Sequence, residues 1–205
     1  MGWIAWAILP PKLWPKIRPK PKRAITFEEH KKIVAAEHNL ERRQYYEVLW
    51  ELGGAQTDTV SLTAENINWE TRTIVYQRQK LSPGSEPACL AIGARLEEIL
   101  RRLPSQGSLF PHLIKTIDSD RSSEFRRRCR TVGVQGISLH CYRYAWAQRA
   151  KEAGYPERWA QAALGHNSRA VHQAYARGAK VICPSLEEYE KKIIPLPHPQ
   201  AQSEA

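Results

Sequence analysis

Residues 138–154 read SLHCYRYAWAQRAKEAG and predict a helix. Ser138 is the expected N-cap and Gly154 the expected end, because serine accepts hydrogen bonds from the first turn and glycine readily takes the left-handed conformation that closes a helix. His140 and Arg143 are three positions apart, so their side chains lie on one face of that helix. Both side chains can therefore converge on a single target.

Helical patterns flank this segment on both sides. Upstream, Thr26 and Glu29 form a capping box that starts one helix, and a glycine pair at residues 53–54 ends a second. A short helix then passes through Val60. Apolar side chains that recur with a period of 3.6 residues predict further helices on both sides of residues 138–154. Two precede this segment, at residues 94–103 and 122–133, and two follow it, at residues 156–166 and 168–180.

One stretch breaks the helical period. From residue 73 to residue 78 the side chains alternate between two faces, with Thr73, Val75 and Gln77 on one and Ile74, Tyr76 and Arg78 on the other. A Ser-Pro-Gly turn follows, and a second short run ends at Ile92. This pattern predicts a β-hairpin with Lys80 at its tip. The expected fold class is mainly α with one small antiparallel β-sheet, an α+β domain.

The length of 205 residues suits one main domain with tails. Residues 1–23 form a basic, proline-rich linker, which cannot be a helix interior or a central strand. It is either a solvated tether or a segment that lies along phosphates. We expect the main domain at residues 24–194 and a disordered tail at residues 195–205. The apolar run near Met1 is too short to span a bilayer, so no membrane partner is expected.

The charge balance points to an anionic partner. The chain has 31 Lys and Arg against 21 Asp and Glu, a net charge of +10, which favours an anionic partner such as nucleic acid or an acidic membrane surface. The cysteines show no CxxC spacing, so neither a zinc site nor a disulfide framework is indicated, and we expect reduced thiols in a cytoplasmic protein. These are Cys89, Cys129, Cys141 and Cys183.

Five side chains suit chemistry at a phosphate. Arg143 offers a permanent, bidentate charge, and His140 offers a donor that also exchanges protons. His166, in the sequence Leu-Gly-His, adds a second donor, and Lys80 can act as general acid on a leaving oxygen. Tyr175 is the candidate nucleophile, whose phenol would give a covalent phosphotyrosine. Such a site needs no metal or other cofactor, because cationic side chains neutralise the charge that builds on phosphorus.

Each of these residues also has a structural interpretation. His140 and Arg143 can simply occupy a wet helix face, His166 can cap a helix, and Lys80 can discourage pairing at a sheet edge. His172, three residues before Tyr175, is interpreted as a surface neighbour. The order and spacing of the set favour the catalytic interpretation.

Taken together, the hairpin lysine, the HxxR pair in LHCYR, the LGH motif and a tyrosine nine residues after its histidine resemble the catalytic domain of the tyrosine recombinases, or phage-type integrases. The resemblance covers residues 24 to 190. It implies cleavage through a 3′-phosphotyrosine and strand exchange between two DNA sites by a homotetramer. In such a tetramer a C-terminal segment packs on a neighbouring subunit, and residues 184–194 are the candidate here.

The sequence departs from this family at two points. Members carry a first catalytic arginine in a stretch resembling TGxRxxE, whereas here Ala55 or Gln56 occupies that place and Asp58 lies near the acidic position. Gln56 can donate a neutral hydrogen bond but no charge, so an arginine from elsewhere, such as Arg78 or one in the linker, is a candidate replacement. Members also place a DNA-gripping domain upstream, and the segment before residue 24 is too short for one.

Three functions follow from these observations. The first is site-specific DNA recombination or integration in a mobile element, by an isolated catalytic domain whose activity the lost arginine would reduce. The second is a non-catalytic DNA-binding relative, which the lost arginine favours. The third is a nicking-closing enzyme similar to type IB topoisomerases, which shares the chemistry without pairing two sites.

Overall fold

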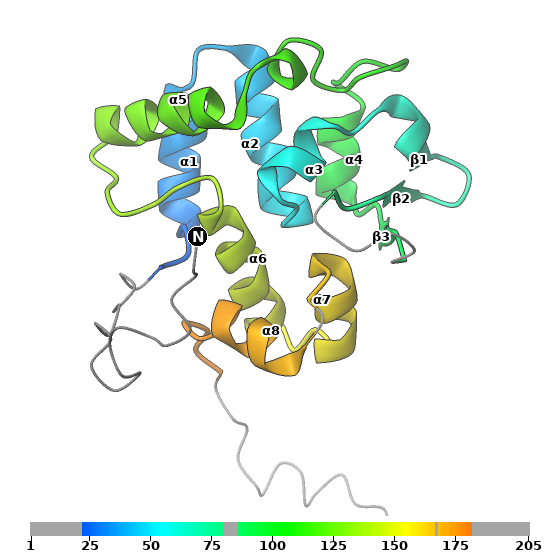
Figure 1. The fold of residues 1–205 in the computed structure, drawn as a ribbon, viewed down its shortest axis with the longest axis vertical. Helices are drawn as coiled ribbons and strands as arrows, with labels where there is room; N and C mark the ends of the chain where they lie inside the picture. The colour runs from blue at the N-terminus through cyan, green and yellow to red at the C-terminus, as the bar shows by residue number, and fades with distance from the viewer. Residues whose placement is uncertain (1–21, 80–85, 167, 182–205) are drawn as a thin grey trace, which may run out of the picture.

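The computed structural model describes residues 22–79, 86–166 and 168–181, and helices make up most of it, with a small sheet at one side (Figure 1). The predicted class, mainly α with one small antiparallel sheet, is confirmed. The predicted linker up to residue 21, the hairpin tip with Lys80 and the C-terminal segment from residue 182 lie outside the described residues. The helices are α1 (Phe27–Ala36), α2 (Leu40–Leu52), α3 (Gln56–Val60), α4 (Ala94–Leu100), α5 (Asp118–Thr131), α6 (Cys141–Glu152), α7 (Glu157–Leu164) and α8 (Arg169–Tyr175). Short 3-10 turns lie at Ala64–Asn66 and Leu113–Lys115.

Helix α2 is the centre of the fold and packs against α1, α3, α4 and α6. The side chain of Asn39 caps its start, and Gly53 ends it in the left-handed conformation at φ 63°. Aromatic and aliphatic side chains cover most of its circumference, which is why it is enclosed on several sides. Its buried apolar residues are Tyr45, Tyr46, Val48, Leu49, Trp50 and Leu52.

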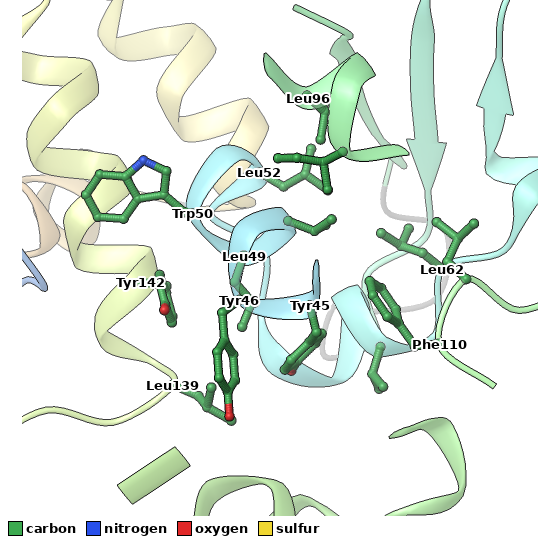
Figure 2. Packing of buried hydrophobic residues seen from close by; sticks show 14 of the residues in the cluster. Tyr45, Tyr46, Leu49, Trp50, Leu52, Leu62, Leu96, Phe110, Leu139 and Tyr142 are labelled. Atoms are coloured by element: carbon green, nitrogen blue, oxygen red, sulfur yellow. The ribbon is translucent and has the colours of Figure 1, made fainter. Parts of the chain in front are cut away.

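Aromatic rings join α2 to the helices around it (Figure 2). The ring of Tyr46 lies 5.2 Å from that of Phe125 in α5 and 6.4 Å from that of Tyr142 in α6. On the other side, Tyr45 meets Phe110 edge to face at 5.4 Å. These rings bury large apolar areas in preferred geometries, so they account for much of the cohesion of the core.

The sheet has the order β1-β2-β3 and is antiparallel throughout, with β1 at Ile67–Asn68, β2 at Thr73–Tyr76 and β3 at Ala88–Ala91. Strands β2 and β3 are the predicted hairpin, in a register that pairs Ile74 with Leu90. Strand β1 was not predicted, because two residues are too few to show a period. The predicted alternation is confirmed: Ile74, Tyr76 and Arg78 are buried at 0%, 6% and 7% exposure.

The start of α6 differs from the prediction. His140, and not Ser138, stands in the N-cap position. The carbonyl of Ser138 accepts a hydrogen bond from the N–H of Cys141 at 2.8 Å. Ser138 therefore belongs to a tight turn before the helix and does not occupy its N-cap position. The predicted end is right, because Gly154 follows α6 at φ 69°. Helix α8 is shorter than expected and ends at Tyr175.

A second, smaller apolar cluster joins the three C-terminal helices. Its buried members are Ala147 of α6, Leu164 of α7 and Ala176, which follows α8. Trp146 and Tyr175 pack against them. Small residues let these helices approach closely, and Figure 1 shows α6, α7 and α8 side by side in its lower part. The candidate nucleophile is therefore anchored by its own local core.

We expect Gly53→Ala to destabilise the fold by about 2–4 kcal/mol. The left-handed backbone conformation costs a non-glycine residue about 1 kcal/mol. The new Cβ would also lie 2.6 Å from Cγ of Trp146, and such overpacking typically costs about 1–3 kcal/mol. Equilibrium denaturation in urea measures the loss.

Gly107→Ala is the matched control. Gly107 has nearly the same φ, 65°, but a Cβ there would meet nothing within 4 Å. The Gly107 variant should lose only about 1 kcal/mol of its free energy of unfolding, which is the backbone contribution alone. Equal losses in the two variants would contradict the proposed contact between Gly53 and Trp146.

Candidate active site

The structure brings Tyr175 and His140 together from the end of α8 and the start of α6. The His140 Nε2 atom and the Tyr175 hydroxyl oxygen are 2.9 Å apart, a hydrogen-bond distance in which the tautomer decides which atom donates. His140 is the N-cap residue of α6, and its ring meets that of Tyr175 edge to face, with centroids 5.5 Å apart. The histidine is thus within reach of the proton that an attacking phenol must lose.

Two further rings fix the orientation of Tyr175. The ring of Tyr144 stacks on it, with centroids 4.4 Å apart and planes 15° apart. The ring of His166 lies at 4.4 Å on a tilt of 43°. The sequence did not single out Tyr144, although its position four residues after His140 places both on one face of α6. The phenol is consequently held by packing as well as by its hydrogen bond.

Arg143 joins this group through two backbone carbonyls. Its Nη1 donates to the carbonyl of Gly53 at 3.1 Å, and its Nη2 donates to the carbonyl of Leu164. These carbonyls lie at the C-terminal ends of α2 and α7, where helices carry partial negative charge. The guanidinium carbon lies 5.9 Å from the centroid of the Tyr175 ring. Arg143 is therefore fixed beside the candidate nucleophile, with N–H groups remaining for a ligand.

His166 lies directly after Gly165, which closes α7 in the left-handed conformation at φ 65°. Its backbone N–H donates to Gln161, as the capping interpretation expects, but its ring turns into the site. Its Nδ1 is 3.3 Å from Nδ1 of His172, and its buried Nε2 has no hydrogen-bond partner among the described residues. Burial, followed by the charge of Arg143, lowers the pKa of His166 to about 3, so the ring is neutral at ordinary pH.

The interpretation of His172 as a surface neighbour is wrong. Its side chain is only 4% exposed and contacts His166. Burial lowers the pKa of His172 as well. The spacing of three residues to Tyr175 is the signal that places both on one side of α8. His172 thus packs against the ring of His166.

Gln56 lies apart from this group. Its side-chain oxygen accepts a hydrogen bond from the hydroxyl of Ser122 at 3.2 Å, and its backbone carbonyl accepts one from Tyr45 at 2.9 Å. Asp58 is buried and accepts a hydrogen bond from the backbone N–H of Gln79 at 3.0 Å. The stretch that was expected to supply the first arginine therefore places Gln56 against α5. Lys80 lies outside the described residues, and its role stays a prediction.

The described residues offer little to a metal. In these ranges, no group of three or more His, Cys, Asp and Glu side chains is placed to hold an ion. Cys89, Cys129 and Cys141 are free thiols. No helix between residues 22 and 181, as far as it is described, combines the length and the apolar character that crossing a bilayer requires.

We expect the imidazole of His166 to stay uncharged between pH 5 and pH 8 in the folded protein. The unfolded value is about 6.5, and the pKa of His166 in the fold is about 3. As the pH falls below about 6.5, the unfolded chain takes up a proton that the folded chain refuses, so the free energy of unfolding decreases. NMR titration of the histidine ring protons measures this directly.

His166→Gln is the control, because its amide is neutral at every pH. Its free energy of unfolding should fall less than that of the wild type between pH 6.5 and pH 4.5. His30, whose pKa burial lowers to about 4, contributes to the pH dependence of both proteins and cancels in the difference. A ring signal of His166 that titrates near pH 6 would contradict the assignment.

Comparison with known proteins shows a family match. A family described as the phage integrase family matches residues 23–180. The tyrosine recombinase XerD of Mycobacterium leprae is 26% identical over 151 residues, which cover 66% of this chain and 48% of that protein. The chain thus spans about half the length of this curated relative.

Solved structures show the same fold at low identity. The XerA recombinase matches with a TM-score of 0.63 and 17% identity, over 90% of this chain and 67% of that one. A lambda integrase dimer bound to a COC′ core site matches with a TM-score of 0.65 and 18% identity, over 83% of this chain and 65% of that one. With a family match that extends over most of the chain, the protein belongs to the phage integrase family of tyrosine recombinases.

Proposed function

We propose that this chain carries the catalytic part of a site-specific recombinase that cleaves double-stranded DNA through a covalent bond to Tyr175. The observation that carries the proposal is the 2.9 Å contact between the Tyr175 hydroxyl and Nε2 of His140. Arg143 and His166 pack against the same phenol ring. A nucleophile beside a proton acceptor and a fixed cation is the arrangement that phosphoryl transfer to a side chain requires.

The first chemical step can be written with these residues. The Tyr175 oxygen attacks phosphorus, its proton passes to Nε2 of His140, and the bond from phosphorus to the 5′ oxygen breaks. Arg143 neutralises charge on the non-bridging oxygens, and the neutral His166 donates to one of them. Lys80 is proposed to protonate the leaving oxygen. The 3′-phosphotyrosine keeps the bond energy, so a 5′ hydroxyl of another strand can religate without a cofactor.

The exposed side of α5 is the proposed contact with the DNA backbone. Arg128 and Arg121 of this helix are turned inward, the first toward Glu37 at 3.3 Å and the second buried. Arg126 and Arg130 are exposed. Since exposed arginines pair with phosphates and release counterions, this face suits a duplex regardless of sequence.

The homotetramer is part of the same proposal. The lambda integrase is described as a tetramer on a Holliday junction, and residues 184–194 of this chain are the candidate exchanged segment. A non-catalytic DNA-binding role is the second candidate, because neither Ala55 nor Gln56 supplies the charge of an arginine. A nicking-closing enzyme is the third, and relaxation of a supercoiled plasmid that carries a single site separates it from a recombinase.

Tyr175→Phe should abolish covalent attachment to DNA. A pool of nicked duplexes with randomised sequence is a suitable substrate, because the cleaved fragment diffuses away and prevents religation. We expect the wild type to give a protein–DNA adduct that survives denaturation, and the variant to give none, since phenylalanine has no nucleophile. Gel electrophoresis and sequencing of the trapped DNA measure the outcome.

Tyr144→Phe is the matched control. It keeps the stacked ring at 4.4 Å from Tyr175 and loses only a hydroxyl, so adduct formation should persist. An adduct that survives in the Tyr175 variant and is lost in the Tyr144 variant would transfer the nucleophile to Tyr144. Absence of an adduct from the wild type, together with retained duplex binding, would favour the non-catalytic alternative.

Arg126→Gln combined with Arg130→Gln should weaken non-specific duplex binding. The slope of log affinity against log salt should fall by about two, about one for each lost phosphate contact. Fluorescence anisotropy across a salt series measures it. The matched control combines Arg95→Gln in α4 with Arg101→Gln at the C-cap of this helix, which removes the same net charge from residues paired with Glu51 and Glu97. Equal slopes in both double variants would contradict a role for α5.

A further inference from the structure

The buried face of the hairpin carries a cation into the site. Strand β2 alternates, and its inward positions hold Ile74 and Tyr76. The same period continues beyond the strand to Arg78, which is only 7% exposed. Arginine is rarely buried unless it has specific partners, so the contacts of Arg78 require an explanation.

Arg78 reaches the last turn of α7. Its Nη2 donates to the carbonyl of Ala163 at 2.8 Å and also to that of Ala162. Its side chain lies flat against Gly165, where an added Cβ would be 2.7 Å from Cδ and Nε of the arginine. His166 is the next residue along the chain. Arg78 is therefore held beside the candidate active site by backbone that belongs to that site.

Two guanidinium groups bind backbone carbonyls of this turn. Arg143 donates to the carbonyl of Leu164, the residue that follows the two carbonyls bound by Arg78. The charge of Arg143 lowers the pKa of Arg78, although burial lowers it more. The charge of Arg78 in turn contributes to the lowered pKa of His166. Cations placed this close repel one another, and an anion between them would relieve the repulsion.

A purely structural role explains only part of this arrangement. Binding two carbonyls at the end of α7 satisfies Nη2, as a capping side chain would. It leaves the buried Nε of Arg78 without a hydrogen-bond partner among the described residues. Tyr76 and, to a smaller extent, Asp58 raise the pKa of Arg78, and the carboxylate of Asp58 already accepts a hydrogen bond from Gln79. One donor of this guanidinium is therefore unpaired among the described residues, and a bound anion would satisfy it.

We propose that Arg78 supplies the second guanidinium that binds the scissile phosphate, in a chain where neither Ala55 nor Gln56 offers one. The proposal rests on the proposed function. Arg78 and Arg143 would share the negative charge that the non-bridging oxygens gain as Tyr175 attacks.

The test compares a charged with an uncharged phosphate. The pool of nicked duplexes is prepared once with normal phosphodiesters and once with methylphosphonates, in which a methyl group replaces one non-bridging oxygen and removes the negative charge. We expect Arg78→Gln to slow adduct formation on phosphodiesters on the order of 100- to 1000-fold. On methylphosphonates, the variant and the wild type should differ by a factor of about two to three at most, because little charge remains to be neutralised.

Arg149→Gln is the matched control. Arg149 is another inward-facing arginine of α6; it donates to the carbonyl of Trp50, over whose ring its guanidinium lies at 4.1 Å. Its loss should lower stability and leave the ratio of rates on the two substrates at the wild-type value. An Arg78 variant that loses the same factor on both substrates would overturn the proposal and leave only the capping role.

A second measurement needs no DNA. Orthovanadate is a phosphate mimic, and its binding to each folded protein is measured by calorimetry, with circular dichroism as the check on folding. We expect Arg78→Gln to weaken binding on the order of 10- to 100-fold and Arg149→Gln to leave it unchanged. If the wild type gives no adduct, the proposed function fails, while this difference still supports an anion site at Arg78. Equal binding by all three proteins, or none by the wild type, overturns it.

Discussion

The hydrogen bonds of Arg143 hold together the part of the molecule on which the site depends. A half-buried guanidinium must find acceptors, and here they are the carbonyls of Gly53 and Leu164. Those carbonyls end α2 and α7, so a single side chain of α6 fixes the ends of two other helices. Because α2 is the centre of the main core, the small C-terminal cluster is placed relative to the whole fold by this contact.

Tyr175 depends on that placement. The residue ends a helix of seven residues, too short to be stable by itself. Ala147 and Ala176 are small enough to let α8 approach α6, and the rings of Tyr144 and His166 then contact the phenol on its faces. As the proposed nucleophile, a hydroxyl held by packing would need little reorganisation before attack, which is the benefit of a preorganised site.

Charge is distributed unevenly around this point. Arg78 and Arg143 donate to carbonyls of the same helix end, and Tyr76 and Asp58 only partly offset the lowering of the Arg78 pKa by burial and by Arg143. Burial and the nearby positive charges lower the pKa of His166 to about 3. A neutral imidazole keeps one N–H to donate without adding a further charge. The positive charges at this helix end therefore favour the binding of an anionic ligand.

The local elements and the candidate residues were determined by the sequence itself. Capping at Thr26, the glycine stop at Gly53 and the period of two around Ile74 act over a few residues, so they can be recognised without knowing the fold. The predicted N-cap at Ser138 is wrong, because Ser138 lies in a tight turn that precedes α6. The spacing of His140, Arg143, His166 and Tyr175 also predicted a common site, as the resemblance implied.

Only the tertiary structure decided which side chains meet. His140 and Tyr175 are 35 residues apart, and their contact requires α6 and α8 to pack against each other. The stacking of Tyr144, the burial of His172 and the approach of Arg78 to α7 have the same origin. Periodicity fixes the face of a helix or strand on which a residue lies, but the partner of that face depends on how distant segments fill the space between them.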